Sequence, residues 1–283
     1  MSRVILVTGC QGQVGWELVR TLAPLGTVVA VDRTRCDLSD PDAIRAVVRE
    51  TRPAVIANAA AYTAVDKAET EQALARAVNG VAPGILAEEA RRLGALLVHY
   101  STDYVFDGSG TCPFDESDAP GPLGTYGRTK LEGEQAITTI GPRHFTLRTS
   151  WVYGNRGQNF LRTMLRLGAE RSELRVVADQ IGAPTWCRMI AEATAILVAT
   201  SLRSDTESGV FHLAAGGETS WHGFARAILK RTHPAVVVHP IPSSEYPLPA
   251  ARPKNSRLSP AKLRDRFGIA LPDWETSLAH CLS

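Results

Sequence analysis

The sequence has no long hydrophobic run, and this absence excludes a membrane-spanning protein. No stretch approaches the roughly 20 uninterrupted apolar residues that a transmembrane helix needs. The apolar run Val4–Val7 is also far too short for the core of a secretory signal and is typical of a β-strand. We therefore expect no membrane partner and a cytoplasmic location.

Cysteine is scarce, with five residues in the chain and no pair at the CxxC spacing. An odd number without close pairs suits a reducing compartment. The seven histidines are scattered, and none lies at metal-ligand spacing from another histidine or from a cysteine. The residues alone therefore predict no metal site.

Neither sign of charge dominates, because 31 basic residues stand against 29 acidic ones. The net charge of +2 gives no electrostatic reason to expect nucleic acid as a partner. A hydrophobic content of 44% and a charged content of 21% describe a soluble globular protein with a full core.

The first half of the chain alternates short β-branched runs with helical patterns, which favours a parallel sheet wound by crossover helices. The predicted strands are Arg3–Thr8, Thr27–Val31, Ala54–Asn58, Ala95–Tyr100 and His144–Thr149. The predicted helices are Val14–Ala23, Pro41–Glu50, Ala73–Leu93 and Tyr126–Thr138. Right-handed crossovers make this an α/β fold with a Rossmann-type doubly wound sheet.

The pattern changes after about Tyr153, where strands become shorter. We expect a Rossmann domain over residues 1–153 and mainly a smaller substrate-binding lobe over 154–283, with a chain that can cross between the two. Helices are predicted at Phe160–Glu170, Cys187–Thr200 and Trp221–Arg231. The turn-rich stretch Asp107–Gly124 is too long for a simple connection and indicates a functional loop.

Three glycines, Gly9, Gly12 and Gly15, follow the first predicted strand at a spacing of three. Such a loop lets the backbone approach a pyrophosphate, and the next helix offers its free N–H groups. Asp32, at the end of the second strand, favours NADH through the ribose hydroxyls, whereas Arg33 could hold the 2′-phosphate of NADPH. The alternative is an ordinary glycine-rich turn with an incidental acid.

Tyr126 and Lys130 lie four residues apart at the start of a predicted helix and so share one face. An ammonium near the phenol would lower the pKa of Tyr126 and assist proton transfer, and the same lysine could bind a nicotinamide ribose. In isolation this spacing is equally typical of a surface helix pair.

Two further candidates, Thr102 and Trp151, follow predicted strands, and a third group lies near the end of the chain. Thr102 could donate a hydrogen bond to a substrate carbonyl oxygen, or it could be a turn cap. Trp151 could wall a sugar or base, or be a core residue. Two guanidiniums, Arg252 and Arg257, flank Asn255 and suggest a diphosphate clamp, with a surface basic turn as the alternative.

With these motifs the chain resembles the extended short-chain dehydrogenases/reductases from end to end. The matching segments are Thr8–Glu17, Asn58–Ala68, His99–Phe106, Tyr126–Glu134, Arg148–Gly154, Asp179–Thr185 and Arg252–Leu258. The last three are similar to a branch that acts on nucleotide-linked sugars. The resemblance implies reduction of the C4 keto group of a dTDP-linked 6-deoxysugar by NADPH or NADH.

The resemblance also implies site residues. Implied cofactor contacts are Gly12, Gln13, Val14, Asp32, Asp37, Leu38, Ala61, Tyr62, Thr63, Tyr126 and Lys130, and implied substrate contacts are Thr102, Asp103 and Trp151. A homodimer and a magnesium ion at Glu17 follow from the resemblance only. Three alternatives stay open: a nucleotide-sugar epimerase or dehydratase, a non-catalytic cofactor-binding subunit, and a reductase of another 6-deoxysugar.

Overall fold

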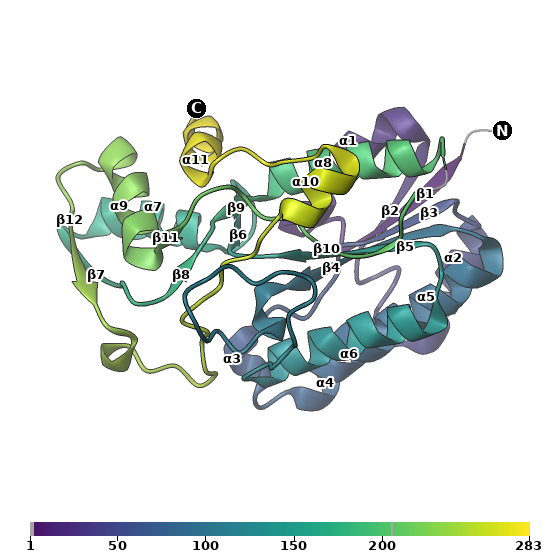
Figure 1. Cartoon of the computed structure of the whole chain (residues 1–283), viewed down its shortest axis with the longest axis horizontal. Coiled ribbons are helices and arrows are strands. Elements are labelled where there is room, and N and C mark those ends of the chain that lie inside the picture. The colour runs from purple at the N-terminus through teal and green to yellow at the C-terminus, as the bar shows by residue number, and fades with distance from the viewer. Residues whose placement is uncertain (1–2, 205) are drawn as a thin grey trace.

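Six parallel strands form the central sheet of the computed structural model, which describes residues 3–204 and 206–283 (Figure 1). Their order across the sheet is β10-β5-β4-β3-β1-β2. They are β1 (Val4–Thr8), β2 (Thr27–Val31), β3 (Val55–Asn58), β4 (Leu96–Thr102), β5 (His144–Thr149) and β10 (Gly209–His212). The predicted Rossmann-type α/β fold is confirmed.

Helices cover both faces of this sheet, which explains why its central strands are buried along their whole length. One face packs against α1 (Gln13–Leu22), α8 (Cys187–Ser201) and α10 (Ala261–Phe267). The other packs against α2 (Pro41–Thr51), α5 (Ala82–Leu93) and α6 (Thr125–Ile140). Figure 1 shows the two helical layers above and below the strands.

The helix predicted over residues 73–93 is not continuous, and that prediction is wrong in detail. The structure has α4 (Gln72–Arg76), a π-helical turn η2 (Ala77–Val81) and then α5. The wide turn carries Asn79, whose Oδ1 accepts the Tyr62 N–H at 2.9 Å and whose Nδ2 donates to the Tyr62 carbonyl at 3.0 Å. The interrupted helix thus fixes the loop that follows β3.

The second lobe holds the remaining long helices, α7 (Phe160–Glu170), α9 (Trp221–Thr232) and α11 (Trp274–Leu282). They pack on three short strand pairs: β7 (Glu173–Val177) with β12 (Val237–Ile241), β8 (Ile181–Gly182) with β11 (Thr219–Ser220), and β6 (Val152–Tyr153) with β9 (Thr185–Trp186). Between them the chain returns to the main sheet through α8 and β10.

Short helical turns complete the description: η1 (Ala23–Leu25), α3 (Val65–Ala68), η3 (Asp103–Val105) and η4 (Ser243–Glu245). Among residues 3–204 and 206–283, no helix has the length and apolar character needed to cross a membrane.

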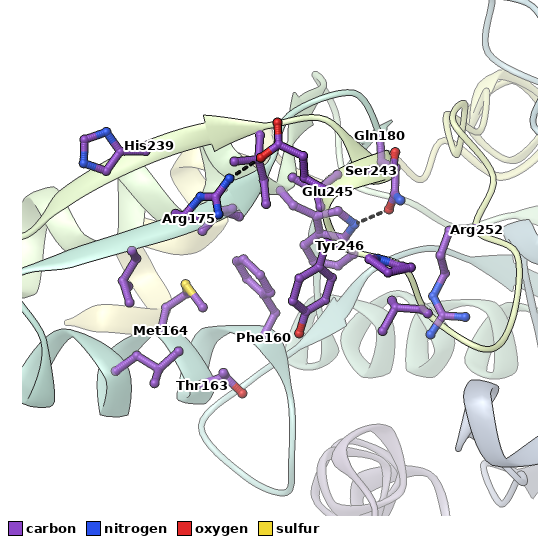
Figure 2. Close-up of a pocket in the computed structure, with 18 of the residues that line it drawn as sticks. Phe160, Thr163, Met164, Arg175, Gln180, His239, Ser243, Glu245, Tyr246 and Arg252 are labelled. Carbon is purple, nitrogen blue, oxygen red and sulfur yellow. Dashed lines mark hydrogen bonds and ion pairs between the residues drawn. The ribbon is translucent and has the colours of Figure 1, made fainter.

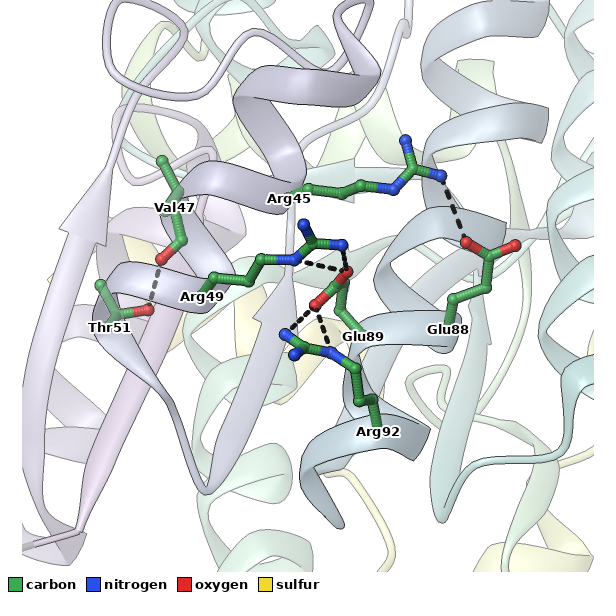
Figure 3. Close-up of polar contacts among 7 residues, drawn as sticks. All are labelled: Arg45, Val47, Arg49, Thr51, Glu88, Glu89 and Arg92. Atoms are coloured by element: carbon green, nitrogen blue, oxygen red, sulfur yellow. Dashed lines mark hydrogen bonds and ion pairs between the residues drawn. The ribbon is translucent and has the colours of Figure 1, made fainter.

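Glu89 on α5 binds two arginines, Arg49 from α2 and Arg92 from its own helix, as Figure 3 shows. Its buried carboxylate accepts from Arg49 at 2.7 Å and, through its other oxygen, from Arg92 at 2.5 Å. One residue earlier, Glu88 makes a single 3.3 Å pair with Arg45 and is largely exposed. Of these two glutamates, Glu89 is the one that is buried and bonded on both carboxylate oxygens. It should therefore stabilise the packing of α2 on α5 more than Glu88 does.

We expect Glu89→Gln to lower the free energy of unfolding by about 1–3 kcal/mol, because it weakens hydrogen bonds between charged groups. The matched change Glu88→Gln should cost less than about 0.5 kcal/mol. Urea denaturation of both variants at neutral pH measures the difference. Equal losses for the two variants would contradict this account of the α2–α5 contact.

Candidate active site

The glycine loop after β1 packs against the loop after β3 at backbone distance. Gly9 has a φ of 66°, and a Cβ added there would lie 2.7 Å from the Ala60 nitrogen. A Cβ on Gly15 would lie 2.1 Å from the Gly9 carbonyl oxygen. Two of the three glycines are therefore required by the turn itself.

Gly12 is different, because a Cβ there would meet only the Gly9 oxygen, at 3.2 Å. It is the N-cap of α1, and no side chain caps that helix end. The N–H groups of the first turn, at Gln13 and Val14, are thus not taken by a capping side chain and can receive a phosphate. The loop fits the pyrophosphate of a dinucleotide.

Asp32 lies at the end of β2 in the position expected for a ribose-binding acid. One carboxylate oxygen accepts from Gln11 Nε2 at 2.6 Å, and the other accepts from the Thr34 hydroxyl at 2.6 Å. Arg33 instead pairs with Asp37 at 3.1 Å. Gln11 of the glycine loop therefore orients the Asp32 carboxylate, whereas Asp37 holds the guanidinium of Arg33.

The remaining predicted cofactor residues line the same edge of the sheet. Leu38 is buried beneath the turn after β2. Ala61, Tyr62 and Thr63 follow β3, with Tyr62 fixed by Asn79 as described above. Gln13 accepts from Asn159 Nδ2 at 2.9 Å and so links the glycine loop to the second lobe.

Thr102 and Tyr126 meet at the carboxyl end of β4. Thr102 lies close enough to the Tyr126 phenol to lower its pKa through hydrogen bonding. The Thr102 hydroxyl oxygen also accepts the Tyr104 N–H at 3.2 Å, and the hydroxyl donates to Asp103 Oδ1 at 3.0 Å. Thr102 therefore caps η3, and its hydrogen bond to a substrate carbonyl oxygen stays a prediction.

Burial raises the pKa of Tyr126 to about 12, although the hydrogen bond with Thr102 opposes the rise. The expectation that Lys130 would lower this pKa is wrong for the chain alone. The reason is the direction of the lysine: its Nζ lies 2.5 Å from the Tyr100 carbonyl oxygen and 3.1 Å from His99 Nε2. At neutral pH Tyr126 is therefore a protonated phenol, able to donate.

Lys130 is almost entirely buried, with 2% of its surface exposed. Burial lowers its pKa to about 8, and the carboxylate of Glu134, one turn further along α6, opposes that fall. Glu134 is itself held by a buried ion pair with Arg148 at 2.7 Å.

A cavity of about 1060 Å³ opens in the second lobe, between α7, the β7–β12 pair and the segment 243–254. Its walls include the aromatic side chains of Tyr104, Phe160, Trp221 and Tyr246. Figure 2 shows Phe160, Tyr246 and Arg252 on these walls. Tyr104 also packs edge to face on Tyr126, with ring centroids 5.6 Å apart, so one wall residue of the cavity contacts Tyr126.

Trp151 lies behind this wall. Its ring stacks on Trp221 with centroids 3.6 Å apart, and only 9% of Trp151 is exposed. Its φ of 49° places it in the left-handed region, which is costly for a tryptophan. In this arrangement Trp221 forms the cavity wall and Trp151 supports it, so direct substrate contact by Trp151 stays a prediction.

The predicted clamp at 252–257 is divided. Arg252 lines the cavity and pairs with Asp66 at 2.8 Å. Arg257 instead pairs with Glu218 at 2.5 Å, and Asn255 donates to the Ser109 and Cys112 carbonyls. Asn255 thus anchors the long loop at 107–124. Substrate contacts by Asn255 and Arg257 stay predictions.

Several cavity residues were not foreseen from the sequence. Trp221, Tyr246 and Phe160 come from separate elements of the second lobe and belong to no local motif, whereas Lys254 lies inside the matching segment Arg252–Leu258 but was not singled out. The prolines gathered between His239 and Pro253, around Tyr246, were the available signal.

Glu17 does not fit a magnesium site in this chain. Its carboxylate pairs with Arg20 at 3.1 Å and Arg188 at 3.5 Å, so two guanidiniums occupy the positions that a cation would take. Among the described residues, no group of three or more His, Cys, Asp or Glu side chains is placed to hold a metal ion.

The sheet, the glycine loop and the Thr102–Tyr126–Lys130 arrangement are those of an extended short-chain dehydrogenase/reductase. The family model described as "RmlD substrate binding domain" matches residues 2–283. A curated dTDP-4-dehydrorhamnose reductase of Burkholderia thailandensis is 51% identical over 98% of this chain and 97% of its own length. The chain belongs to the dTDP-4-dehydrorhamnose reductase family.

Further relatives agree. The dTDP-4-dehydrorhamnose reductase of Salmonella typhimurium is 45% identical over 99% of this chain and 97% of its own length. A crystal structure of the Bacillus anthracis dTDP-4-dehydrorhamnose reductase, in complex with NADP, superposes with a TM-score of 0.94. It is 37% identical, and the match covers 100% of this chain and 99% of that one.

Asp103 generates a prediction about stability. Burial raises the pKa of its carboxyl to about 6, although hydrogen bonds with Ser256 and Thr102 oppose the rise. The folded chain thus keeps a proton that the unfolded chain releases near pH 4, so this stabilisation is full below about pH 4 and is lost as the pH rises through 6.

We expect wild type to lose on the order of 3 kcal/mol of unfolding free energy relative to Asp103→Asn between about pH 4 and 7. Urea denaturation of the cofactor-free protein across this range measures it. Asp107→Asn is the control of opposite sign, because a backbone hydrogen bond from Ser109 lowers the pKa of Asp107. A pH-independent difference between Asp103→Asn and wild type would contradict the assignment.

Proposed function

We propose that this chain reduces the C4 keto group of dTDP-4-dehydro-6-deoxy-L-mannose (dTDP-4-dehydrorhamnose), with NADPH or NADH, to dTDP-L-rhamnose. This is the last step of dTDP-rhamnose synthesis. The observation that carries the proposal is the Tyr126 phenol at the carboxyl end of β4, which lies beside Thr102 and packs against Tyr104 of the cavity wall. A bound nicotinamide would supply the hydride.

Thr102 and Tyr126 would act together on the carbonyl oxygen. The Thr102 hydroxyl oxygen is held by the Tyr104 N–H, and its single proton, which is donated to Asp103 Oδ1 in the free chain, would turn to the substrate oxygen as negative charge develops. Tyr126 holds its proton at neutral pH because burial raises its pKa. It can therefore protonate the oxygen as the alkoxide forms.

Lys130 would hold the cofactor ribose beside Tyr126. Its Nζ has two fixed neighbours, the Tyr100 carbonyl and His99, which leave one N–H free to bind a ribose hydroxyl. Its positive charge would also stabilise a phenolate after Tyr126 has given up its proton.

The cavity suits a nucleoside diphosphate sugar in chemical character. Aromatic rings at Phe160, Trp221 and Tyr246 can stack on a flat base, and the cations Arg252 and Lys254 can neutralise a diphosphate. Its volume of about 1060 Å³ lies at the upper end of the range for small-molecule sites, which accommodates a large substrate.

Three alternatives are separated by direct measurements. An epimerase or dehydratase would retain NAD⁺ and consume no NADPH. A non-catalytic subunit would bind cofactor without turnover, although Thr102, Tyr126 and Lys130 are all present. A sibling reductase would consume NADPH but give a different sugar by product NMR. The proposed homodimer and the cytoplasmic location rest on the family and on the composition.

We expect Tyr126→Phe to lower kcat by about 10²–10⁴-fold, because the variant cannot protonate the oxygen. The Kd for NADPH should stay within about threefold of wild type, since the phenol hydroxyl is not a phosphate contact. A spectrophotometric assay with dTDP-4-dehydrorhamnose and fluorescence titration with NADPH measure the two values.

Tyr153→Phe is the control for this experiment. The Tyr153 hydroxyl is buried without a hydrogen-bond partner in the second-lobe core, so its removal should leave kcat unchanged. Turnover by Tyr126→Phe at the wild-type rate would refute the proposed chemistry.

We expect Arg252→Gln to raise KM for the dTDP-sugar about tenfold or more with a smaller change in kcat, because a charge in the cavity wall is lost. Arg166→Gln is the matched control, since Arg166 on α7 is exposed and pairs with Glu170. Steady-state kinetics at saturating NADPH measures both. An unchanged KM for Arg252→Gln would remove the second-lobe cavity from the substrate site.

A further inference from the structure

A row of polar side chains crosses the face of the sheet beneath α6. Thr8 on β1 is the register partner of Asn58 on β3, and Asn58 is the register partner of His99 on β4. Neighbours in register project from the same face. The side chains of the row therefore point toward α6, and Lys130 of α6 contacts the row at His99.

The row is buried and continuous. Thr8, Asn58 and His99 are each 1% exposed. Thr8 Oγ1 lies 2.6 Å from Asn58 Oδ1, Asn58 Nδ2 lies 3.0 Å from His99 Nδ1, and His99 Nε2 lies 3.1 Å from Lys130 Nζ. Buried polar groups are costly unless paired, so four of them in one row indicate a selected arrangement.

Counting hydrogen-bond donors and acceptors along the row gives two arrangements in which every contact between neighbours has one donor and one acceptor. With the Thr8 hydroxyl donating to Asn58 Oδ1, the Asn58 amide donates to His99 Nδ1, and the ring proton must lie on Nε2. That N–H can only donate to Lys130 if Nζ is a neutral amine.

A charged Lys130 requires the reverse order. An ammonium donates to a lone pair on His99 Nε2, which puts the ring proton on Nδ1. The Asn58 amide, turned over in place, then accepts from Nδ1 and donates to Thr8. In both states Nζ also donates to the Tyr100 carbonyl, and one N–H remains unpaired.

We propose that His99 is a positioning residue for Lys130, whose ring takes the tautomer complementary to the charge on the lysine. Nζ is thereby held in one place in both charge states, and the row ties it to the strand that leads into the glycine loop. In a titration the row as a whole gains or loses one proton to solvent. The inference rests on the proposed function only in taking Lys130 as the ribose-binding lysine.

The surrounding charges are compatible with this behaviour. Burial and the charge of Lys130 keep the pKa of His99 well below 6.5, so the ring stays neutral. His144, at the start of β5, acts on His99 in the same direction. On α6, Glu134 attracts the charge of Lys130 but is neutralised by Arg148. The lysine is therefore the group of this row that titrates near pH 8.

The direct test is nitrogen-15 NMR of histidine-labelled, cofactor-free protein between pH 6.5 and 9.5, with His99 assigned through His99→Gln. We expect Nδ1 and Nε2 of His99 to exchange their protonated and unprotonated signals over the interval in which the Lys130 amine titrates. A ring that keeps one tautomer while Lys130 titrates would overturn the proposal. This measurement needs no substrate and is independent of the proposed function.

Two substitutions test positioning in the holoenzyme. The amide of His99→Gln can still reach Lys130, whereas that of His99→Asn can reach only Asn58. We expect His99→Asn to lower kcat about tenfold to a hundredfold, to weaken NADPH binding and to shift the pH profile of kcat, with a smaller loss in His99→Gln. His233→Gln, at the end of α9 in the second lobe, is the control and should match wild type.

Equal kinetics and equal pH profiles for His99→Asn and wild type would overturn the positioning role. If His99→Asn does not fold, as judged by circular dichroism, the NMR titration of wild type still decides the matter. Failure of wild type to reduce dTDP-4-dehydrorhamnose would refute the proposed function, while the tautomer measurement would stand on its own.

Discussion

The structure depends on the register of one parallel sheet, because that register brings the ends of β1, β3 and β4 to the same edge. Thr8, Asn58 and His99 lie side by side across it, and the glycine loop, the Ala59–Thr63 segment and Thr102 follow directly. A shift of β4 by one residue would turn Thr102 and His99 each to the face opposite the one it now occupies. The apolar faces packed against α1 and α8 and against α5 and α6 oppose such a shift.

Burial sets the chemistry at this edge. It raises the pKa of Tyr126 and of Asp103 and lowers the pKa of Lys130, so each of these groups is less charged than it would be in water. A neutral phenol can donate a proton, and a lysine whose pKa is about 8 can be charged or neutral near physiological pH. The site is thus prepared for a proton transfer before any substrate binds.

Several elements of the fold were predictable because local patterns determine them. The bounds of β2, β5 and α7 agree with the sequence prediction, as does the i, i+4 placement of Tyr126 and Lys130. The interrupted helix around Asn79 was not predictable, since a tertiary contact with Tyr62 produces it. Trp221 and Tyr246 were missed for a similar reason: only the folding of the second lobe brings them together. His99 opens the matching segment His99–Phe106 but was given no role, because a histidine at the end of an apolar run is equally typical of a core residue.

The central claim is that the edge holding Thr102, Tyr126 and Lys130 directs a hydride to C4 of a dTDP-linked sugar. The most direct measurement uses NADPH that carries deuterium at the transferring position of its nicotinamide ring, with NMR of the purified sugar product. The account predicts one deuterium at C4 of dTDP-L-rhamnose and equimolar oxidation of the cofactor. Product without deuterium at C4, or isomerised sugar without cofactor oxidation, would contradict it.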